Sequence, residues 1–288
     1  MKEYKEITIV IVTFLSDDII YDFIKNIPKS IKIIIIENAN NPKLKRKLET
    51  KHRNVKVFLK KNDGVSASLN FGVKKVQTKY FIQLSPDVIV NYKDIKKFIS
   101  YAKKLNDNFC ALGPRFLKTK KRGHIQIDEN LKIGKIDSIH GSYMFFNTKK
   151  FNDIGGFDQN IFLYFEETEY CYRGKKYNLD SYQINSIKTQ TIDTTVQINN
   201  NKRKRENWLY LLIWHFIWSK FYFSKKRFGF VVSFLLFIPI MVRIFFRLSI
   251  YSIFNNKPKL RKYRFRLNGL YHSIIGSKSF LRLKDIKD

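Results

Sequence analysis

The stretch ITIVIVTFLSDDIIYDFIKNIPKSIKIIIIE, residues 7–37, predicts the fold of this chain. It begins with Ile7–Thr13 and ends with Lys32–Glu37, two short β-branched runs that are almost entirely apolar, as in strands covered on both faces. Between them, Asp17–Asn26 has the apolar spacing of a helix. A strand, a helix and a second strand in this order predict a βαβ unit with parallel strands.

The same alternation continues to residue 104. Two further apolar runs are predicted strands, Val55–Leu59 and Tyr80–Leu84. Three further stretches are predicted helices, Pro42–Lys51, Val65–Val76 and Tyr92–Lys104, and the predicted N-caps are Asp17, Asn41 and Asn91. The sequence therefore predicts an α/β fold, a Rossmann-like sheet with helices on both faces, whose ligands bind beyond the carboxyl ends of the strands. After residue 105 the pattern is less regular, and it predicts two strands, Phe109–Phe116 and Ser142–Asn147, and a short helix, Glu167–Tyr177.

The charge of the chain is strongly positive and unevenly distributed. Its 288 residues carry 55 Lys and Arg against 24 Asp and Glu, a formal charge of +31. Residues 202–288 hold 20 of the bases and only three of the acids. A hydrophobic fraction of 44% excludes a wholly disordered protein. Cys110 and Cys171 have no metal-ligand spacing and indicate a reducing compartment. Since no signal-peptide pattern opens the chain, we expect its α/β part to be cytoplasmic.

The composition predicts two domains, residues 1–200 and residues 201–288, the second being helical, aromatic and basic. Within the second, Trp208–Phe223 is crowded with aromatic residues, and Phe228–Val242 is a fifteen-residue apolar run that contains Pro239. Aromatic-rich helices flanked by Lys and Arg typically lie in the membrane interface and hold anionic headgroups. We therefore expect this region to attach the protein to a membrane surface.

Three alternatives for residues 228–254 stay open at this point. The segment would span a membrane if Arg243 and Arg247 reached the interface with their long side chains. It would form a re-entrant hairpin if it bent at Pro239. It would be a buried helical subdomain if other helices covered it.

One stretch of this basic chain is acidic. The fifteen residues Asp158–Tyr172 contain four acids and no base, and Glu166, Glu167 and Glu169 lie among Phe and Tyr residues. Ionising a carboxylate beside apolar rings is costly unless the carboxylate binds a cation or takes up a proton during a reaction. This pattern is typical of a general base or a metal site.

Polar residues also follow the predicted strands. Glu37 ends one strand, Asn62-Asp63-Gly64 follows the next, and Asp87 stands just after Tyr80–Leu84. The carboxyl ends of parallel strands share one edge of the sheet, where a ligand or metal would meet these side chains. A capping role in the turn before Asn91 is the alternative for Asp87.

In this order, the motifs resemble glycosyltransferase family 2, nucleotide-sugar enzymes of the GT-A fold, and most closely its rhamnosyltransferase-like branch of bacterial surface-glycan enzymes. The resemblance covers about residues 7–200 and rests on five stretches: Ile11–Leu15, Ile36-Glu37-Asn38, the Asn62, Gly64, Asn70 and Gly72 series, Leu84-Ser85-Pro86-Asp87, and Gly155–Arg173. It implies an inverting, metal-dependent transfer of a hexosyl or rhamnosyl group from a dTDP- or UDP-sugar.

The resemblance also implies roles for individual residues. Glu167, in place of the family's Asp, would be the catalytic base, with Glu166 and Glu169 beside it raising its pKa. Asp87 would bind Mg²⁺ or Mn²⁺ at the donor diphosphate, with Ser85 in place of an Asn or Asp. Asp193 stands where the family often has a metal-binding His. The implied donor nucleotide site comprises Thr13, Glu37, Asn62, Asp63 and Gly64, and His140 is a candidate acceptor-site residue.

The family and the basic tail together predict where the enzyme works and on what. We expect a nucleotide-sugar donor and a glycan or polyprenyl-diphosphate-linked acceptor, at the cytoplasmic face of the inner (plasma) membrane, and no nucleic-acid partner. Two alternatives differ in class. The first is a catalytically degenerate homologue that binds nucleotide-sugar without transferring it. The second is a basic nucleic-acid-binding protein, against which stand the wide spread of the bases and the lack of a recognised motif.

Overall fold

The computed structural model describes residues 4–117, 125–192 and 202–286. The chain forms two compact units. The first comprises Met1–Asp158 and Glu166–Gln197, and the second comprises Gln159–Phe165 and Ile198–Asp288. The seven residues before Glu166 thus belong with the C-terminal unit, and a boundary at residues 200 and 201 stays a prediction.

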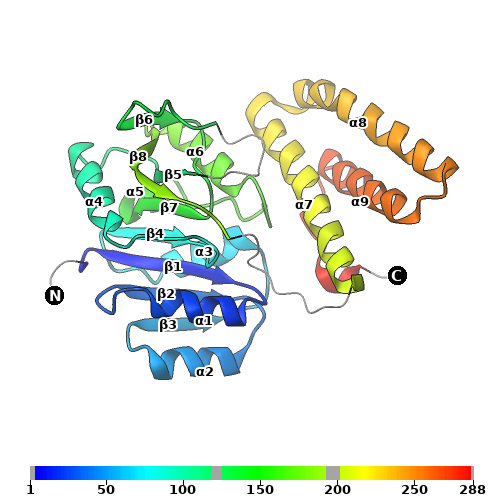
Figure 1. Cartoon of the computed structure of the whole chain (residues 1–288). Coiled ribbons are helices and arrows are strands. Elements are labelled where there is room, and N and C mark those ends of the chain that lie inside the picture. The colour runs from blue at the N-terminus through cyan, green and yellow to red at the C-terminus, as the bar shows by residue number, and fades with distance from the viewer. Residues whose placement is uncertain (1–3, 118–124, 193–201, 287–288) are drawn as a thin grey trace. The chain divides into compact units, whose positions relative to one another are not determined.

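The first unit is built on an eight-stranded sheet in the order β3-β2-β1-β4-β7-β5-β8-β6 (Figure 1). The strands are β1 (Ile7–Thr13), β2 (Lys32–Glu37), β3 (Val55–Leu59), β4 (Tyr80–Leu84), β5 (Leu112–Phe116), β6 (Ile133–Ile136), β7 (Tyr143–Asn147) and β8 (Ser181–Thr189). The neighbours among β1 to β4 pair in parallel, whereas β7 runs antiparallel to β4 and β5, and β6 antiparallel to β8. The predicted bounds of the first four strands are confirmed.

Helices cover both faces of this sheet, as the sequence predicted. They are α1 (Asp17–Lys25), α2 (Pro42–Lys51), α3 (Val65–Val73), α4 (Asp94–Lys104), α5 (Thr148–Asp153) and α6 (Glu166–Lys176). Buried side chains of α1, α2 and α4 share one hydrophobic cluster with one face of the sheet. Buried side chains of α3, α5 and α6 share a second cluster with the other face. The result is a three-layer α/β/α arrangement.

Alternation along the strands divides the core between these two clusters. In β1, Ile9 and Ile11 belong to one cluster and Val10 to the other, because successive side chains point to opposite faces. Aromatic rings fill both sides of the β4–β7 pair. Phe81 stacks on Phe146 with 4.7 Å between ring centroids, and on the other face Phe98 of α4 stacks on Phe145 at 5.3 Å.

Two of the three predicted N-caps differ from the observed ones. Asn41 caps α2 as predicted, since its Oδ1 accepts from the backbone N–H groups of Lys43 and Leu44 at 3.1 Å. Ser16 rather than Asp17 precedes α1. Asn91 caps the turn before α4 instead of the helix, because its side chain accepts from the N–H of Lys93 and α4 begins only at Asp94.

The described part of the second unit consists of three long helices and a short 3₁₀ turn. The helices are α7 (Lys202–Phe228), α8 (Phe230–Ile253) and α9 (Lys257–Ile274), and the turn is η1 (Leu283–Asp285). Gly229, at φ 79°, makes the turn from α7 to α8, a left-handed conformation that glycine adopts at little cost. Pro239 lies inside the continuous α8, so the alternative of a hairpin bent at Pro239 is wrong.

Aromatic side chains join these helices. Trp214 and Trp218 of α7 are buried, and Gly269 of α9 lies against α7 so closely that a Cβ atom on it would stand 2.6 Å from the carbonyl oxygen of Trp214. Phe162, from the segment before α6, stacks on His215 of α7 at 4.4 Å. The segment at residues 159–165 is therefore packed into the core of the second unit.

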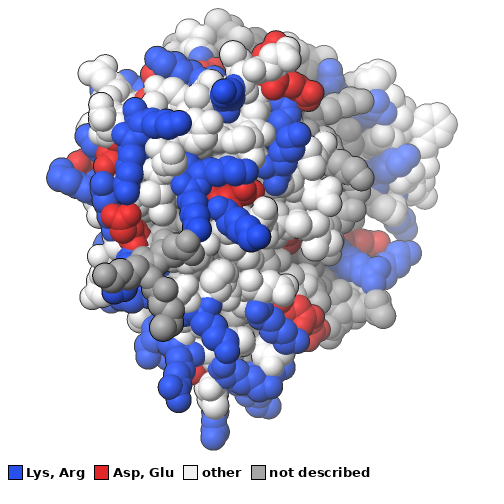
Figure 2. Space-filling model, turned by 60° about the vertical axis from the view of Figure 1, so that its left-hand side comes forward, with Lys and Arg blue, Asp and Glu red and all other residues white. Residues whose placement is uncertain are grey.

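Lys and Arg side chains are spread over the face drawn in Figure 2, with Asp and Glu side chains between them. Exposed ion pairs form across the first unit, such as Lys25 with Asp22 and Lys149 with Asp153, each 2.8 Å from N to O. Pairs of this kind contribute only about 0–1 kcal/mol to stability. The surface charge therefore bears on solubility and partners more than on the fold.

Candidate active site

The carboxyl ends of β1 and β2 bring Thr13 and Glu37 side by side, since the two residues are paired in the sheet register. Glu37 is fully buried, and its Oε1 and Oε2 accept from the backbone N–H groups of Ala39 at 2.9 Å and Asn41 at 2.6 Å. Burial raises the pKa of Glu37, while these two hydrogen bonds oppose that rise. The carboxylate thus holds the backbone of the loop between β2 and α2 through these two hydrogen bonds. The hydroxyl of Thr13 is buried and has no hydrogen-bond partner among the described residues.

The turn after β3 lies at the same edge of the sheet. It is tied to β2 by the N–H of Lys60, which donates to the carbonyl of Glu37 at 2.9 Å. Asn62 Oδ1 accepts from the N–H of Gly64 at 3.2 Å and so shapes the turn into α3. Asp63 is half exposed and lies 3.8 Å from the Lys60 ammonium. The sheet therefore brings together the predicted donor-site residues that end β1, β2 and β3.

Asn70, on α3, connects this region to the Gly155-Gly156-Phe157 turn. Its Nδ2 donates to the carbonyl of Phe157 at 2.8 Å, and its Oδ1 accepts from the N–H of Phe157 at 2.9 Å. Gly156 has a φ of 68°, and a Cβ atom on it would stand 2.7 Å from Asn70 Oδ1. Glycine is required there for both reasons.

Asp87 stands in the loop after β4, at the same end of the sheet. The N–H of Ser85 donates to the carbonyl of Ser142 at 2.9 Å, and the N–H of Ile192 donates to the carbonyl of Asp87 at 2.7 Å. The loop is thereby fastened on one side to the start of β7 and on the other to the segment after β8. Asp193, the next residue, lies outside the described residues. Within the described ranges no three His, Cys, Asp or Glu side chains gather as a ligand cluster.

Helix α6 begins at Glu166 and carries the three acids in its first turn. The two residues before it, Tyr164 and Phe165, have φ angles of 67° and 68°. Bulky side chains rarely adopt this left-handed conformation, and it costs of order 1–3 kcal/mol per residue. Phe165 packs on Phe223 of α7 with 6.0 Å between ring centroids. Packing in the second unit thus stabilises an unfavourable backbone at the entrance to α6.

The three acids of α6 have different surroundings. Glu169 is buried and pairs with Arg173 through two contacts, Nε to Oε1 at 3.0 Å and Nη2 to Oε2 at 2.8 Å. Arg173 Nη2 also donates to the carbonyl of Gly156 at 2.6 Å. Glu169 therefore holds an arginine that fastens the glycine turn. Glu166 is buried as well, and Glu167 is half-buried.

The loop His140-Gly141-Ser142 lies beside the Glu167 carboxylate. A Cβ atom built on Gly141 would stand 3.5 Å from both Cδ and Oε2 of Glu167. The carbonyl of Gly141 accepts from the side-chain amide of Gln83 on β4. His140 Nδ1 hydrogen-bonds to the Ser142 hydroxyl, and the ring of His140 lies 4.3 Å from that of Phe116.

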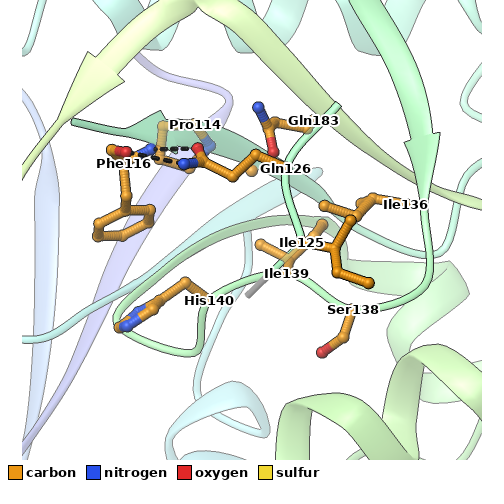
Figure 3. Close-up of a pocket in the computed structure, with 10 residues that line it drawn as sticks. Pro114, Phe116, Ile125, Gln126, Ile136, Ser138, Ile139, His140 and Gln183 are labelled. Carbon is orange, nitrogen blue, oxygen red and sulfur yellow. Dashed lines mark hydrogen bonds between the residues drawn. The ribbon is translucent and has the colours of Figure 1, made fainter. Parts of the chain in front are cut away.

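A pocket of about 300 Å³, counting space open to solvent, lies next to this loop (Figure 3). Its lining includes Ser138 and His140, and the Ser138 hydroxyl hydrogen-bonds to Thr168 of α6 at 3.0 Å. Gln126, also in the lining, makes two hydrogen bonds of 3.0 Å to the backbone of Phe116 (Figure 3). Ser138 therefore gives the pocket lining a hydroxyl that contacts α6.

Sequence reasoning missed the parts played by Gly141 and Arg173. The only local signals were a glycine beside a histidine and an arginine four residues after Glu169, which is the spacing of a helical ion pair. The other predicted residues at the sheet edge are brought together, as are Glu167 and the loop that contains His140. Glu169 pairs with Arg173, whereas the resemblance placed it beside Glu167, where it would raise the pKa of the base.

The chain matches known proteins over most of its length. A family model described as glycosyl transferase family 2 matches residues 8–228. The chain is 24% identical over 221 residues to the low-salt glycan biosynthesis hexosyltransferase Agl10 of Haloferax volcanii, covering 66% of this chain and 69% of that one. It is also 24% identical over 173 residues to the dTDP-rhamnosyl transferase RfbF of Shigella flexneri, covering 54% of this chain and 58% of that one. It thus spans little more than half the length of this second relative.

Solved structures show the same fold. A mannosyltransferase from Pyrobaculum calidifontis in complex with GDP-Man and Mn²⁺ has a TM-score of 0.57 at 12% identity, covering 95% of this chain and 88% of that one. S. aureus TarS 1–349 in complex with UDP-GlcNAc has a TM-score of 0.51 at 11% identity, covering 94% and 92%. At these identities the likeness concerns the fold alone. The predicted GT-A fold is confirmed.

Proposed function

This chain belongs to glycosyl transferase family 2, and from that premise we propose that it is an inverting glycosyltransferase of glycan biosynthesis. The donor is a nucleotide-diphosphate sugar, dTDP- or UDP-linked, and the transferred group is a hexosyl or rhamnosyl residue. The support for a nucleotide sugar is that solved relatives of the same fold hold GDP-Man or UDP-GlcNAc. The support for the sugar class is the hexosyltransferase and the rhamnosyl transferase among the relatives.

One observation carries the proposal: the loop His140-Gly141-Ser142 connects the two candidate catalytic carboxylates. On one side Gly141 lies against the Glu167 carboxylate. On the other, the carbonyl of Ser142 holds the N–H of Ser85, two residues before Asp87. An inverting transfer needs a base on one side of the anomeric carbon and a group that binds the leaving diphosphate on the other side. This loop contacts the segments that carry the candidates for these roles, Glu167 and Asp87.

In the proposed reaction Glu167 acts as the general base. Its carboxylate accepts the proton of an acceptor hydroxyl while that oxygen attacks the anomeric carbon of the donor sugar. The bond between the anomeric carbon and the diphosphate oxygen breaks, and the nucleoside diphosphate leaves with the electron pair. Attack opposite the leaving group inverts the anomeric centre. Glu166 and His140 lie beside this site and help to orient the acceptor and the base.

Asp87 is the proposed ligand of Mg²⁺ or Mn²⁺, together with Asp193. Mg²⁺ is commonly held by one or two carboxylates plus substrate phosphates, so Asp87 beside the donor diphosphate would fit such an ion. When bound there, such an ion would supply positive charge against the diphosphate leaving group. The chain's own contribution is to fix Asp87 between β7 and the segment after β8.

The donor nucleotide is proposed to bind at the ends of β1 to β3. Thr13 offers a buried hydroxyl, and the turn at Asn62-Asp63-Gly64 offers backbone and side-chain polar groups. Glu37 is proposed to contact the base of the nucleotide with the acceptor capacity that its two backbone hydrogen bonds leave.

The acceptor is proposed to be a glycan, or a glycan carried on a polyprenyl diphosphate. The work would take place at the cytoplasmic face of the inner (plasma) membrane, with residues 201–288 as the attachment. The support for membrane attachment is that one helix of the described chain, Phe230–Ile253, is long and apolar enough to cross a membrane.

The function is tested by thermal unfolding of the full chain with UDP-, dTDP- and GDP-sugars, each with and without Mn²⁺. A ligand that binds only the native state raises the melting temperature. We expect one nucleotide class to give a Mn²⁺-dependent rise, and the same donor to be hydrolysed or transferred. Asp87→Ala should abolish the Mn²⁺-dependent part of that rise.

The outcomes separate the candidate functions. No shift with any donor would overturn the proposal. A shift without hydrolysis or transfer on any acceptor would indicate a degenerate homologue that only binds nucleotide-sugar. Steeply salt-dependent binding to arbitrary DNA or RNA, with no donor binding, would indicate the nucleic-acid alternative.

A further inference from the structure

Helix α8 presents one apolar face outward. Val231, Leu235, Val242 and Phe246 are 69%, 57%, 62% and 62% exposed. At 100° per residue these four positions fall on one side of the helix. Only 17% of the most apolar 18-residue window of α8 is buried in the protein, so the helix is not the core of a buried helical subdomain.

The opposite side of α8 is occupied by its own unit. Ser233 and Phe237 face α7, where Ser224 donates to the Ser233 hydroxyl at 2.9 Å and Phe221 lies 5.0 Å from Phe237 between ring centroids. Ile244 lies in the same buried cluster, which includes Leu270 of α9. Contacts with α7 and α9 therefore fix the orientation of α8, so that its apolar outward face is exposed in the folded unit.

The charges around this face have a single sign. From residue 207 to residue 284 the sequence contains no Asp or Glu. Bases stand just before α8, at Lys225-Lys226-Arg227, and along the first half of α9. Arg243 and Arg247, one turn apart, lie on the flank between the outward and buried sides of α8. An apolar surface bordered only by cations is complementary to a bilayer with anionic headgroups.

The packing of α9 along α8 decides between spanning the membrane and lying in it. Tyr251 near the end of α8 lies 5.6 Å from Tyr263 of α9, so α9 runs back along α8. If α8 spanned, Arg266 would stand about 14 Å deeper than Lys257, and Arg243 about 15 Å from the end of α8 at Ile253. Those depths are close to the centre of a hydrocarbon core of about 30 Å, where Lys and Arg are strongly disfavoured.

We propose that α8 lies in the plane of an anionic membrane, with the face of Val231, Leu235, Val242 and Phe246 inserted into one leaflet. Arg243, Arg247 and the bases at both ends of α8 then reach the headgroups of that leaflet. This proposal specifies how the chain would bind the membrane named under the proposed function. It rests on that function only for the cellular location of the membrane. Membrane binding and donor binding are measured separately, so either can fail alone.

The first experiment measures sedimentation of the full chain with vesicles of phosphatidylcholine, alone or mixed with phosphatidylglycerol. We expect binding to the mixed vesicles at low salt, weaker binding at high salt and much less binding to phosphatidylcholine alone. A variant with glutamine at the four outward positions should bind at least tenfold more weakly, with an unchanged melting temperature and donor-induced shift. The matched control is Leu131→Gln with Tyr177→Gln, since these exposed residues lie in the first unit and should not affect vesicle binding.

The second experiment separates lying in the membrane from spanning it. Lys226→Cys and Lys257→Cys place an exposed thiol at either end of α8, and a membrane-impermeant maleimide is added to vesicles carrying the bound protein. We expect both thiols to be labelled without detergent. Protection of one of them until detergent is added would overturn the in-plane placement. A chain that binds no vesicles but dimerises through this face, with the glutamine variant monomeric, would overturn the lipid partner.

Discussion

The Glu167 carboxylate lies against Gly141, because a Cβ atom on Gly141 would stand 3.5 Å from Cδ and Oε2 of Glu167. That distance is an ordinary van der Waals contact, so a methyl group fits there, and we expect a β-branched side chain to press on the carboxylate. Gly141 thereby fixes where the proposed base can lie. The relationship makes Gly141 a positioning residue that can be tested without removing the base.

Substitution of Gly141 should affect activity in proportion to side-chain size. Gly141→Ala should keep the melting temperature and most of the turnover, since its Cβ meets the carboxylate at contact distance. Gly141→Val should push the carboxylate aside and lower kcat by ten- to a hundredfold, because a displacement of about 1 Å can cost that much. The donor-induced thermal shift should persist in both. Equal activity of the two variants would contradict this placement.

Removal of the base itself should have a larger effect on rate than on stability. Glu167→Gln keeps the shape of the side chain and removes its proton acceptor, so kcat should fall by about 10²–10⁴ while the melting temperature changes little. Glu167→Asp tests whether the longer residue is required, since the family's Asp is one methylene shorter. Unchanged turnover in Glu167→Gln would exclude Glu167 as the base.

The two asparagines of the same motif should differ in their effect on stability. Asn70 makes two buried hydrogen bonds to Phe157, at 2.8 and 2.9 Å, whereas Asn62 accepts one bond of 3.2 Å from Gly64 in a partly exposed turn. Asn70→Ala should lower the free energy of unfolding by about 2–4 kcal/mol, because it also orphans the buried backbone groups of Phe157. Asn62→Ala, the matched control, should cost about 1 kcal/mol or less. Urea unfolding measures both, and equal costs would contradict the assignment.

The sequence predicted the N-terminal half of the sheet because its strands are buried on both faces. In β2, Lys32–Glu37, four isoleucines stand between the terminal residues, and the predicted bounds are those observed. β8, Ser181–Thr189, mixes polar and apolar residues and escaped prediction, as did the four half-buried or exposed residues of β6. The pairing of these strands joins residues far apart in the chain, which no local pattern contains.

The sequence predicted which acidic residues belong to the site, but not which of them has which role. The crowding of Glu166, Glu167 and Glu169 indicated chemistry, yet only the fold shows that Glu169 is directed to Arg173 and Glu167 to Gly141. The left-handed backbone of Tyr164 and Phe165 before α6 was also not predictable, since Tyr and Phe rarely adopt this conformation. Tertiary packing stabilises that conformation, and packing is absent from the sequence pattern.

The buried ion pair of Glu169 with Arg173 should contribute far more than an exposed one. Glu169 is 1% exposed and Arg173 22%. Glu169→Gln removes the negative charge that pairs with this largely buried cation and leaves one side-chain oxygen to accept from it. We expect a loss of about 3 kcal/mol, at the low end of the range for broken buried pairs because Arg173 keeps some exposure. Asp22→Asn, which breaks the exposed pair with Lys25, should cost about 0–1 kcal/mol. Similar losses in the two variants would show that the buried pair has no special role.

The second unit should become less stable as pH falls, because of His215. Its Nε2 hydrogen-bonds to the carbonyl of Leu281 and its Nδ1 to the Ser279 hydroxyl, both at 2.9 Å, which satisfies the neutral ring. Burial lowers the pKa of His215 from its ordinary 6.5 to about 3. Between these values the unfolded chain binds a proton that the folded chain does not. Stability is therefore full above pH 6.5 and falls by about 1.4 kcal/mol per pH unit down to about pH 3.

The measurement is urea unfolding of the parent and of His215→Gln between pH 4 and pH 8, monitored by tryptophan fluorescence, because all three tryptophans lie in α7, the helix that carries His215. Carboxylates titrate in the same range in both proteins, so the difference between the two curves isolates the histidine. We expect the advantage of the parent over His215→Gln to shrink by about 2 kcal/mol from pH 6.5 to pH 4.5, since the histidine of the unfolded chain is already half protonated at pH 6.5. A difference that stays constant over that range would mean that His215 titrates alike in the folded and unfolded chains.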